Sequence, residues 1–383
     1  MQYYLNFTFR SILIWFHLIC VDPALSQDKV SRLQHLVDSL CAEGNYPGLS
    51  VAVAYPDNTT QAYVSGFNDI EKGVKLSATD RLMQGSVGKT YVAAIALQLV
   101  EQKRLRLDER VSKYLGDNEW FSRLPNADDI TVRMLMNHTS GIMRYEFKES
   151  FANDLNQNPD KVWKPEEQLA YVLDELPRFK AGQDWEYSDT NYIILGMIIE
   201  KISGTTYHKL LQDNILKPLG LNATLPSNRK KLQGLAQGYA GKDNPFGNRE
   251  KMIGPNGDMI INPQFEWTGG GMYSTTSDLA SWAKLLYEAK AFSQGSLDQM
   301  LAGVPAKLGK DTQYGLGVIL RPTPWGITYG HSGFFPGYLT DMYYFPEHRL
   351  CIAVQTNSSD VRNLKFGLNK VATTIAKEIL GNN

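Results

Sequence analysis

The pattern of apolar and polar positions predicts one helix and two strands in the first part of the chain. The segment "DKVSRLQHLVDSLCAEG" (28–44) has apolar residues at helical spacing and ends on a glycine, which commonly closes a helix. The runs "LSVAVAY" (49–55) and "QAYVSGFND" (61–69) are typical of strands, and the turn-forming residues "PDNTT" separate them. We therefore expect a helix followed by two strands that a turn connects.

The middle of the chain, from about residue 86 to 265, has mostly helical patterns separated by long loops. Its clearest helical stretches are the apolar run after Ser86, "EEQLAYVLDEL" (166–176) and "TNYIILGMIIEKISG" (190–204). Strand patterns return in the last third, and a last helical pattern follows them: "GITYGHSGF" (326–334), "LTDMYYFPE" (339–347), "RLCIAVQTN" (349–357) and "VRNLKFGLNKVATTIAKEIL" (361–380).

This order of elements predicts an α+β fold, in which one antiparallel sheet is flanked by the N- and C-terminal helices and interrupted by a large, mostly helical insertion. The sheet part is expected at about 28–80 and 268–383, and the helical part at about 81–267, within one domain over 28–383. A pocket between the sheet and the insertion is the expected place for a site.

Composition and charge narrow the class of partner. The chain has 383 residues, 43% of them hydrophobic, and a formal net charge of −1, which is ordinary for a globular protein. A near-neutral chain offers no electrostatic footprint for nucleic acid or an anionic membrane, so a small or peptide-like substrate is expected. The six histidines show no metal-binding spacing, and we expect neither a metal nor a cofactor. His138 in "NHTSG" is expected to be a structural turn residue.

The first 27 residues have the pattern of an export signal. One positive charge precedes the apolar run "SILIWFHLIC" (11–20), and small residues follow it, which predicts cleavage after Ser26 or Gln27. The run is short for a membrane span, so we expect no integral membrane domain. The protein is expected to be exported, either periplasmic or secreted. An uncleaved anchor is the alternative. Export would permit a disulfide between Cys41 and Cys351, although Cys351 lies in a buried strand pattern that favours an inert thiol.

The first candidate for chemistry is Ser86, at the head of an apolar helix, with Lys89 three residues further on the same helix face. A serine needs a neighbouring base to become a nucleophile, and a buried lysine can supply one while it is uncharged. The spacing S-x-x-K recurs at Ser26, Ser227 and Ser281, so the pattern alone does not distinguish a nucleophile from a helix cap.

Three short motifs in a fixed order make that distinction: Ser86-Val87-Gly88-Lys89, Tyr187-Ser188-Asp189 and His331-Ser332-Gly333. They resemble the S-x-x-K, Y-x-N and [K/H/W]-x-G motifs of the serine β-lactamase and D,D-peptidase superfamily. The branch concerned contains class C β-lactamases, D-alanyl-D-alanine carboxypeptidases, D-aminopeptidases and carboxylesterases. The likeness covers about residue 30 to the C-terminus and includes three longer stretches: "LMNHTSGI" (135–142), "YSDTNYIILGMIIEKISG" (187–204) and "GGGMYSTTSDLASWAKLL" (269–286).

The resemblance implies a catalytic role for three side chains and two backbone groups. Ser86 would be the nucleophile, and Lys89 and Tyr187 would share the proton transfers, with the identity of the base left open. The backbone N–H groups of Ser86 and Phe334 would form the oxyanion hole. The competing Ser281 lies on an amphipathic helix, where we expect Lys284 to face solvent.

The substrate-binding residues implied by the family pattern are Asp189, His331, Ser332 and Gly333. His331 would contribute a positive charge or a hydrogen bond toward Tyr187 and the substrate carboxylate, or would be only structural. Gly333 would let the substrate backbone approach the strand closely.

Asp189 departs from the family pattern, because it stands where the family has asparagine. An ionised Asp189 can only accept hydrogen bonds, so we expect it to pair with Lys89, to weaken that lysine as a base and to slow acylation by β-lactams. Asn191 is a weaker candidate to replace the missing amide.

The resemblance therefore implies a serine hydrolase that forms an acyl-enzyme on Ser86 with D-Ala-D-Ala-like peptides or related amides and esters, and that reacts with β-lactams. A carboxylesterase or a true β-lactamase of the same family is the alternative. An alternative from another class is a non-catalytic penicillin-binding or sensory protein with the same fold. The expected partner is a small peptide, ester or β-lactam, and the sequence does not predict an oligomeric state.

Overall fold

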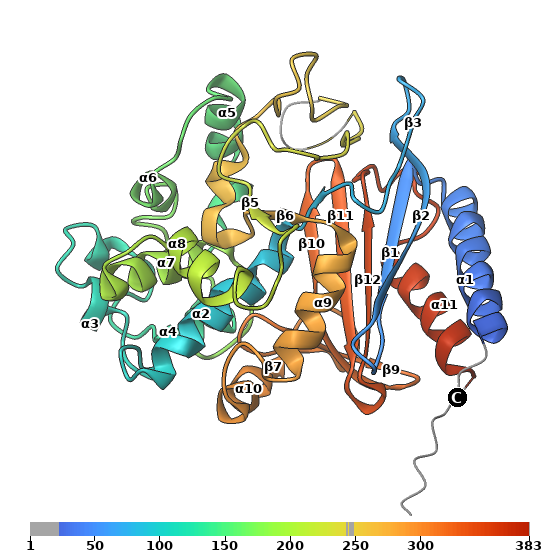
Figure 1. The fold of residues 1–383 in the computed structure, drawn as a ribbon. Coiled ribbons are helices and arrows are strands. Elements are labelled where there is room, and N and C mark those ends of the chain that lie inside the picture. The colour runs from blue at the N-terminus through green and yellow to red at the C-terminus, as the bar shows by residue number, and fades with distance from the viewer. Residues whose placement is uncertain (1–22, 243, 245–248, 383) are drawn as a thin grey trace, which may run out of the picture.

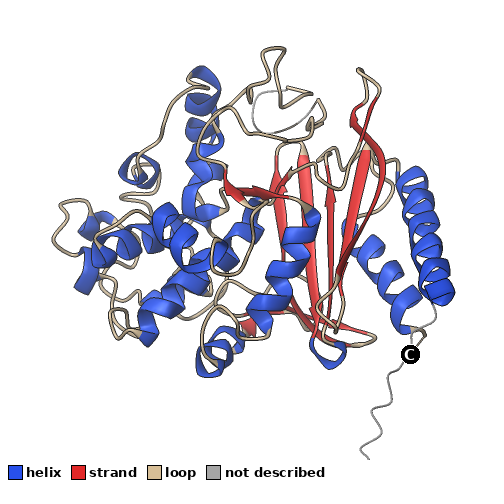
Figure 2. Cartoon of the chain, in the orientation of Figure 1, coloured by secondary structure: helices blue, strands red, loops and turns tan. Residues whose placement is uncertain are grey.

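The computed structural model describes residues 23–242, 244 and 249–382. A large sheet with helices on both faces lies beside a mostly helical part (Figures 1 and 2). Helix α1 (Pro23–Gly44) is the first described element. Most of the expected signal segment, residues 1–22, lies outside the described residues.

The large sheet has nine antiparallel strands in the order β3-β2-β1-β12-β11-β10-β9-β8-β7. Val51 of β1 lies between Tyr63 of β2 and Val354 of β12, so the first hairpin joins the C-terminal strands in one sheet, as the sequence predicted. The strands are β1 (Gly48–Ala54), β2 (Thr60–Asp69), β3 (Val74–Lys75), β7 (Val304–Pro305), β8 (Gln313–Tyr314), β9 (Ile319–Thr323), β10 (Gly326–Phe335), β11 (Tyr338–Phe345) and β12 (Leu350–Thr356).

The period-two alternation along β1 decides which helix covers which face of the sheet. Val51 and Val53 pack into the apolar cluster beneath α1 and α11 (Leu368–Leu380), whereas Ala52 and Ala54 belong to the cluster on the opposite face. Helix α9 (Thr276–Tyr287) packs on that second face against β1 and β12. The short alanine side chains leave room for this close packing.

The helical part surrounds two helices that are apolar on nearly all sides, α2 (Lys89–Glu101) and α7 (Asp189–Ser203). A helix of that composition is stable only when it is buried, and most residues of both helices are. The shorter helices around them are α3 (Ser112–Leu115), α4 (Val132–Met136), α5 (Glu149–Gln157), α6 (Pro165–Leu169), α8 (Tyr207–Leu211) and α10 (Gln294–Leu301). A small sheet, β4 (Leu82–Met83), β6 (Met272–Ser274) and β5 (Leu225–Pro226), joins the two parts. The α+β fold with a mostly helical insertion is therefore confirmed.

Some predicted boundaries were wrong. Helix α6 ends at Leu169 rather than 176, and the turns after it reach Asp174, whose φ of +63° no helix accommodates. The last helix begins at Leu368 rather than 361, directly after Gly367. Lys284, expected in solvent, is buried in an ion pair with Glu288.

Two further expectations concern a disulfide and a membrane-spanning helix. Cys41 and Cys351 are both buried free thiols, so the disulfide that export would permit is not present. Within the described residues, no helix combines the length and the apolar character that crossing a membrane requires.

Candidate active site

Ser86 lies in a single turn, η1 (Gly85–Gly88), that packs backbone to backbone against strand β10. Gly85 has a φ of +51°, and a Cβ atom on it would come within 2.6 Å of the Phe334 nitrogen. A Cβ atom on Gly333 would come within 1.8 Å of the Gln84 carbonyl oxygen. These two glycines bring Ser86 next to Phe334, as an oxyanion hole formed by their backbone N–H groups would require.

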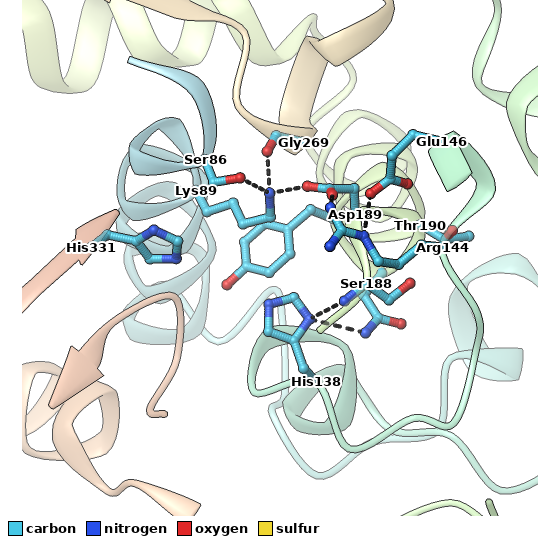
Figure 3. Close-up of polar contacts among 12 residues, drawn as sticks. Ser86, Lys89, His138, Arg144, Glu146, Ser188, Asp189, Thr190, Gly269 and His331 are labelled. Atoms are coloured by element: carbon cyan, nitrogen blue, oxygen red, sulfur yellow. Dashed lines mark hydrogen bonds and ion pairs between the residues drawn. The ribbon is translucent and has the colours of Figure 1, made fainter. Parts of the chain in front are cut away.

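Lys89 begins helix α2 and is fully buried. Its Nζ lies 3.2 Å from Ser86 Oγ and also donates to the Gly269 carbonyl oxygen and to Asp189 Oδ1 (Figure 3). An ammonium group has three N–H donors, so these three acceptors match its protonated form. Lys89 must therefore release a proton before it can accept one from Ser86.

Asp189 begins helix α7 and accepts hydrogen bonds from two cations. One carboxylate oxygen contacts Lys89, and the other accepts from Arg144 Nη2 at 2.9 Å. Burial alone would raise the pKa of Asp189, but Lys89 and Arg144 together hold that pKa well below its usual range. The ion pair expected between Lys89 and Asp189 is therefore present, and the aspartate is ionised.

Arg144 is a site residue that the sequence analysis missed. Its Nε donates to Glu146 Oε1 at 2.5 Å, and its guanidinium lies 3.9 Å from the centre of the Phe147 ring. Glu146 and Phe147 belong to the turn η3 (Tyr145–Phe147), which begins three residues after the end of "LMNHTSGI". Arg144 thus connects this turn to the start of α7.

Tyr187 lies over the cations of the site. The centre of its ring is 4.9 Å from Lys89 Nζ and 5.1 Å from the Arg144 guanidinium carbon, and its hydroxyl is buried. Burial and the Asp189 charge raise the pKa of Tyr187 well above its usual range. The phenol is therefore protonated, a form that can donate a proton.

His331 differs from the expectation of a positive charge. Its Nδ1 lies 2.6 Å from the Ser332 carbonyl oxygen, which can only accept, so Nδ1 carries the proton and Nε2 accepts from the Tyr314 hydroxyl at 2.8 Å. Burial and the Lys89 charge lower the pKa of His331 to about 3. The imidazole is therefore neutral, and it bonds to Tyr314 rather than to Tyr187. The Ser332 side chain bonds to Arg321 and does not line the cavity described below.

His138 and Asn191 form a structural pair behind the site. His138 has a φ of +65°, and its Nδ1 lies 3.2 Å from both Ser188 N and Asn191 Nδ2. Asn191 also accepts from Ser140 Oγ at 2.6 Å, so its amide is engaged and does not replace the one missing at Asp189.

A cavity of about 390 Å³ opens in front of Ser86. Two of its groups are carboxyls that the sequence analysis missed, Glu146 and Glu266, and the Oε2 atom of each is buried. Burial raises the pKa of Glu266 to about 8, and burial and Asp189 raise that of Glu146 well above its usual range. The lining residues are Ser86, Arg144, Tyr145, Glu146, Phe147, Asp189, Phe265, Glu266, Gly269, Phe334 and Pro336.

The described residues contain no group of three or more His, Cys, Asp or Glu side chains arranged to hold a metal ion. In the cavity, Ser86 presents a hydroxyl that lies 3.2 Å from the Lys89 amine.

Comparison with known proteins places this chain in a family. Residues 33–369 match the family model described as Beta-lactamase. Penicillin-binding protein 4* of Bacillus subtilis is 26% identical over 362 residues, which cover 92% of this chain and 77% of that protein. Protein flp of Staphylococcus aureus is 27% identical over 68% of this chain, which spans only 49% of that relative. The D-amino acid amidase of Ochrobactrum anthropi has the same fold, with a TM-score of 0.79, 25% identity and coverage of 92% of this chain and 99% of the amidase.

Proposed function

Because the chain belongs to the β-lactamase family of serine hydrolases, we propose that it hydrolyses small amides and esters of D-Ala-D-Ala-like shape through an acyl-enzyme on Ser86. The observation that supports this most strongly is the Lys89 amine 3.2 Å from the Ser86 hydroxyl in a cavity large enough for a small substrate. The amidase and penicillin-binding relatives support the same reaction class.

In this proposal the reaction proceeds in two halves. Ser86 Oγ attacks the substrate carbonyl and passes its proton to Lys89, once that amine is uncharged. The oxyanion is held by the N–H groups of Ser86 and Phe334. Tyr187, which is protonated in the resting site, donates the proton that the leaving group needs and takes one back from Lys89, so that both groups return to their starting forms. Water then repeats the attack on the acyl-enzyme and releases the product.

The aspartate at position 189 supports a preference within this reaction class. Its oxygens already accept from Lys89 and Arg144, and a carboxylate has no N–H to offer a substrate carbonyl. Penicillins and N-acyl peptides carry an amide carbonyl that an asparagine would hold. We therefore propose that simple esters and amides react faster than penicillin, which favours an amidase, peptidase or esterase over an efficient β-lactamase.

The test is intact-mass analysis of the whole chain after treatment with a fluorophosphonate and, separately, with penicillin over time. We expect one stable fluorophosphonate adduct on the peptide that contains Ser86, and none in Ser86→Ala. Ser281→Ala is the matched control, because Ser281 also precedes a buried lysine by three residues, and it should label normally. Labelling that survives Ser86→Ala would refute the proposal, and labelling without turnover of any ester or amide would favour the non-catalytic binding protein.

Export is proposed separately. We propose that residues 1–27 direct export and are removed after Ser26 or Gln27. Expression in a secreting host, followed by intact-mass analysis of the exported protein, tests this. A chain that stays inside the cell or keeps these residues would refute it.

A further inference from the structure

His138 bonds to the backbone on both sides of Tyr187. Its carbonyl oxygen accepts from Glu186 N at 3.2 Å, and its ring atom Nδ1 accepts from Ser188 N at 3.2 Å (Figure 3). Tyr187 is the residue between these two anchors. One side chain therefore fixes the course of the chain immediately before and after the proposed proton donor.

The imidazole of His138 also packs against the Tyr187 phenol itself. The centres of the two rings are 4.2 Å apart, and their planes are inclined by 39°. Three other aromatic rings lie farther from the phenol, with their centres 6.0–6.5 Å from its centre: Trp185, Tyr314 and His331. His138 is fully buried, so the phenol cannot turn toward it without displacing a closely packed ring.

The imidazole is held in one orientation and one protonation state. Asn191 Oδ1 accepts from Ser140 Oγ, so the amide nitrogen of Asn191 faces His138 Nδ1 at 3.2 Å. This amide nitrogen and Ser188 N can only donate, so Nδ1 accepts from both and the ring proton lies on Nε2. Burial and the Lys89 charge lower the pKa of His138 well below its usual range. A neutral imidazole whose basic nitrogen already accepts two N–H groups is not available as a base.

We propose that His138 is the positioning residue for Tyr187, and that it holds the phenol where the hydroxyl can protonate the leaving group. This inference rests on the proposed acyl-enzyme chemistry at Ser86. In that step the ester C–O bond breaks, the phenol proton moves to the departing oxygen, and Lys89 passes the Ser86 proton to Tyr187. A misplaced phenol should therefore slow the loss of an alkoxide, which needs that proton, far more than the loss of 4-nitrophenolate, which leaves as an anion.

The experiment measures kcat/KM for methyl butanoate and for 4-nitrophenyl butanoate, which form the same acyl-enzyme, and compares their ratio between variants. His138→Gly and His138→Asn both suit the φ of +65° at this position and both remove the ring, but only asparagine offers an oxygen near the place of Nδ1. His138→Gly should lower the methyl to 4-nitrophenyl ratio about 100-fold, and His138→Asn should recover at least about tenfold of that loss. His208→Asn is the matched control, because it removes a half-buried imidazole from α8, and it should leave the ratio unchanged.

An unchanged ratio in His138→Gly, or a ratio in His138→Asn no higher than in His138→Gly, would overturn the inference. Asn191→Leu is a second test that keeps His138 in place. It removes one of the two N–H groups that orient the imidazole and should lower the ratio about tenfold, and an unchanged ratio would count equally against the inference. A wild-type enzyme that cleaves only the 4-nitrophenyl ester would also overturn it. Failure of the proposed function gives a different result, namely no fluorophosphonate adduct on Ser86 and no cleavage of either ester.

Discussion

Replacing Asp189 by asparagine tests the charge arrangement of the site most directly. The change keeps the shape of the side chain and removes the anion that Lys89 and Arg144 share. Lys89 is fully buried and the Asp189 side chain is 14% exposed, and removing one partner of a buried ion pair typically costs about 3–5 kcal/mol of unfolding free energy. Glu146 accepts a hydrogen bond from Arg144. In the variant, the Asp189 charge that helps to raise the pKa of Glu146 is absent. Glu146 can therefore ionise in the variant and strengthen the contact that it already makes with Arg144, so we expect the lower end, about 3 kcal/mol at pH 7.

The pH dependence of this loss has a definite sign. The pKa of Asp189 is lower in the folded protein than in the unfolded chain, so its contribution to stability is complete above about pH 3.9 and is lost as the pH falls toward the folded-state value. Each pH unit below about 3.9 removes about 1.4 kcal/mol, which leaves a difference of about 2 kcal/mol at pH 3. Urea unfolding of both proteins at the two pH values measures it. Asp184→Asn breaks an exposed pair with Lys307 and should have no measurable effect.

The same variant should react faster with penicillin. The asparagine has an N–H group, which the carboxylate lacks, and this N–H can donate to the acyl-amide carbonyl. We expect acylation, followed by stopped-flow or by mass shift, to accelerate about tenfold, which corresponds to about 1.4 kcal/mol. Small esters should gain less, because they lack that amide. If penicillin and ester acylation both slow down, Asp189 is an integral part of the catalytic machinery and this reasoning is wrong.

Three further variants test separate parts of the site. Lys89→Met should lower the acylation rate about 10²- to 10⁴-fold in a folded protein, and near-normal acylation would exclude Lys89 from proton transfer. His331→Gln should leave the shape of the pH–rate profile between about pH 5.5 and 7.5 unchanged, because the imidazole is already neutral there; a lost limb would show that it titrates. The free energy of unfolding of Glu266→Gln, measured with urea and compared with that of the wild type, should become more favourable as the pH rises from about 5 to about 8. The Glu266 carboxyl has a pKa raised to about 8 in the folded protein and a pKa of about 4.3 in the unfolded chain, so the wild type loses stability as the pH rises between these values. A difference in unfolding free energy that stays constant with pH would contradict this.

The sequence predicted the parts of the fold that have a strong local pattern. The strands β10, β11 and β12 are seven to ten residues long, and α7 is apolar over most of its fifteen residues, so their type and place were predictable. The strands β7 and β8 have two residues each and carry no periodicity. They form only because β9 offers an open edge, which is a tertiary effect.

The site also contains contacts that follow from local sequence and contacts that depend on tertiary structure. Ser86 and Lys89 are three residues apart on adjoining helical turns, so their contact follows from local geometry. Arg144, Glu146 and Glu266 lie on turns far from both in sequence, and no spacing relates them to Ser86. His331 was predictable as a strand residue, but its neutral state depends on burial and on the Tyr314 hydroxyl, which belongs to β8.

One sequence feature could have indicated Arg144, namely Asp189, which stands in place of the asparagine of the Y-x-N pattern that the motif resembles. In the proposed reaction Lys89 must lose its proton, and at that moment a buried Asp189 paired only with Lys89 would be left without a counter-charge. A buried anion without a partner is costly, and the lysine would hold its proton to avoid that state. Arginine stays protonated at every accessible pH, so Arg144, 2.9 Å from the second Asp189 oxygen, keeps the carboxylate paired while Lys89 cycles between its charged and uncharged forms. In this site the aspartate therefore has a second, permanent cation, which the segment between "LMNHTSGI" and η3 provides.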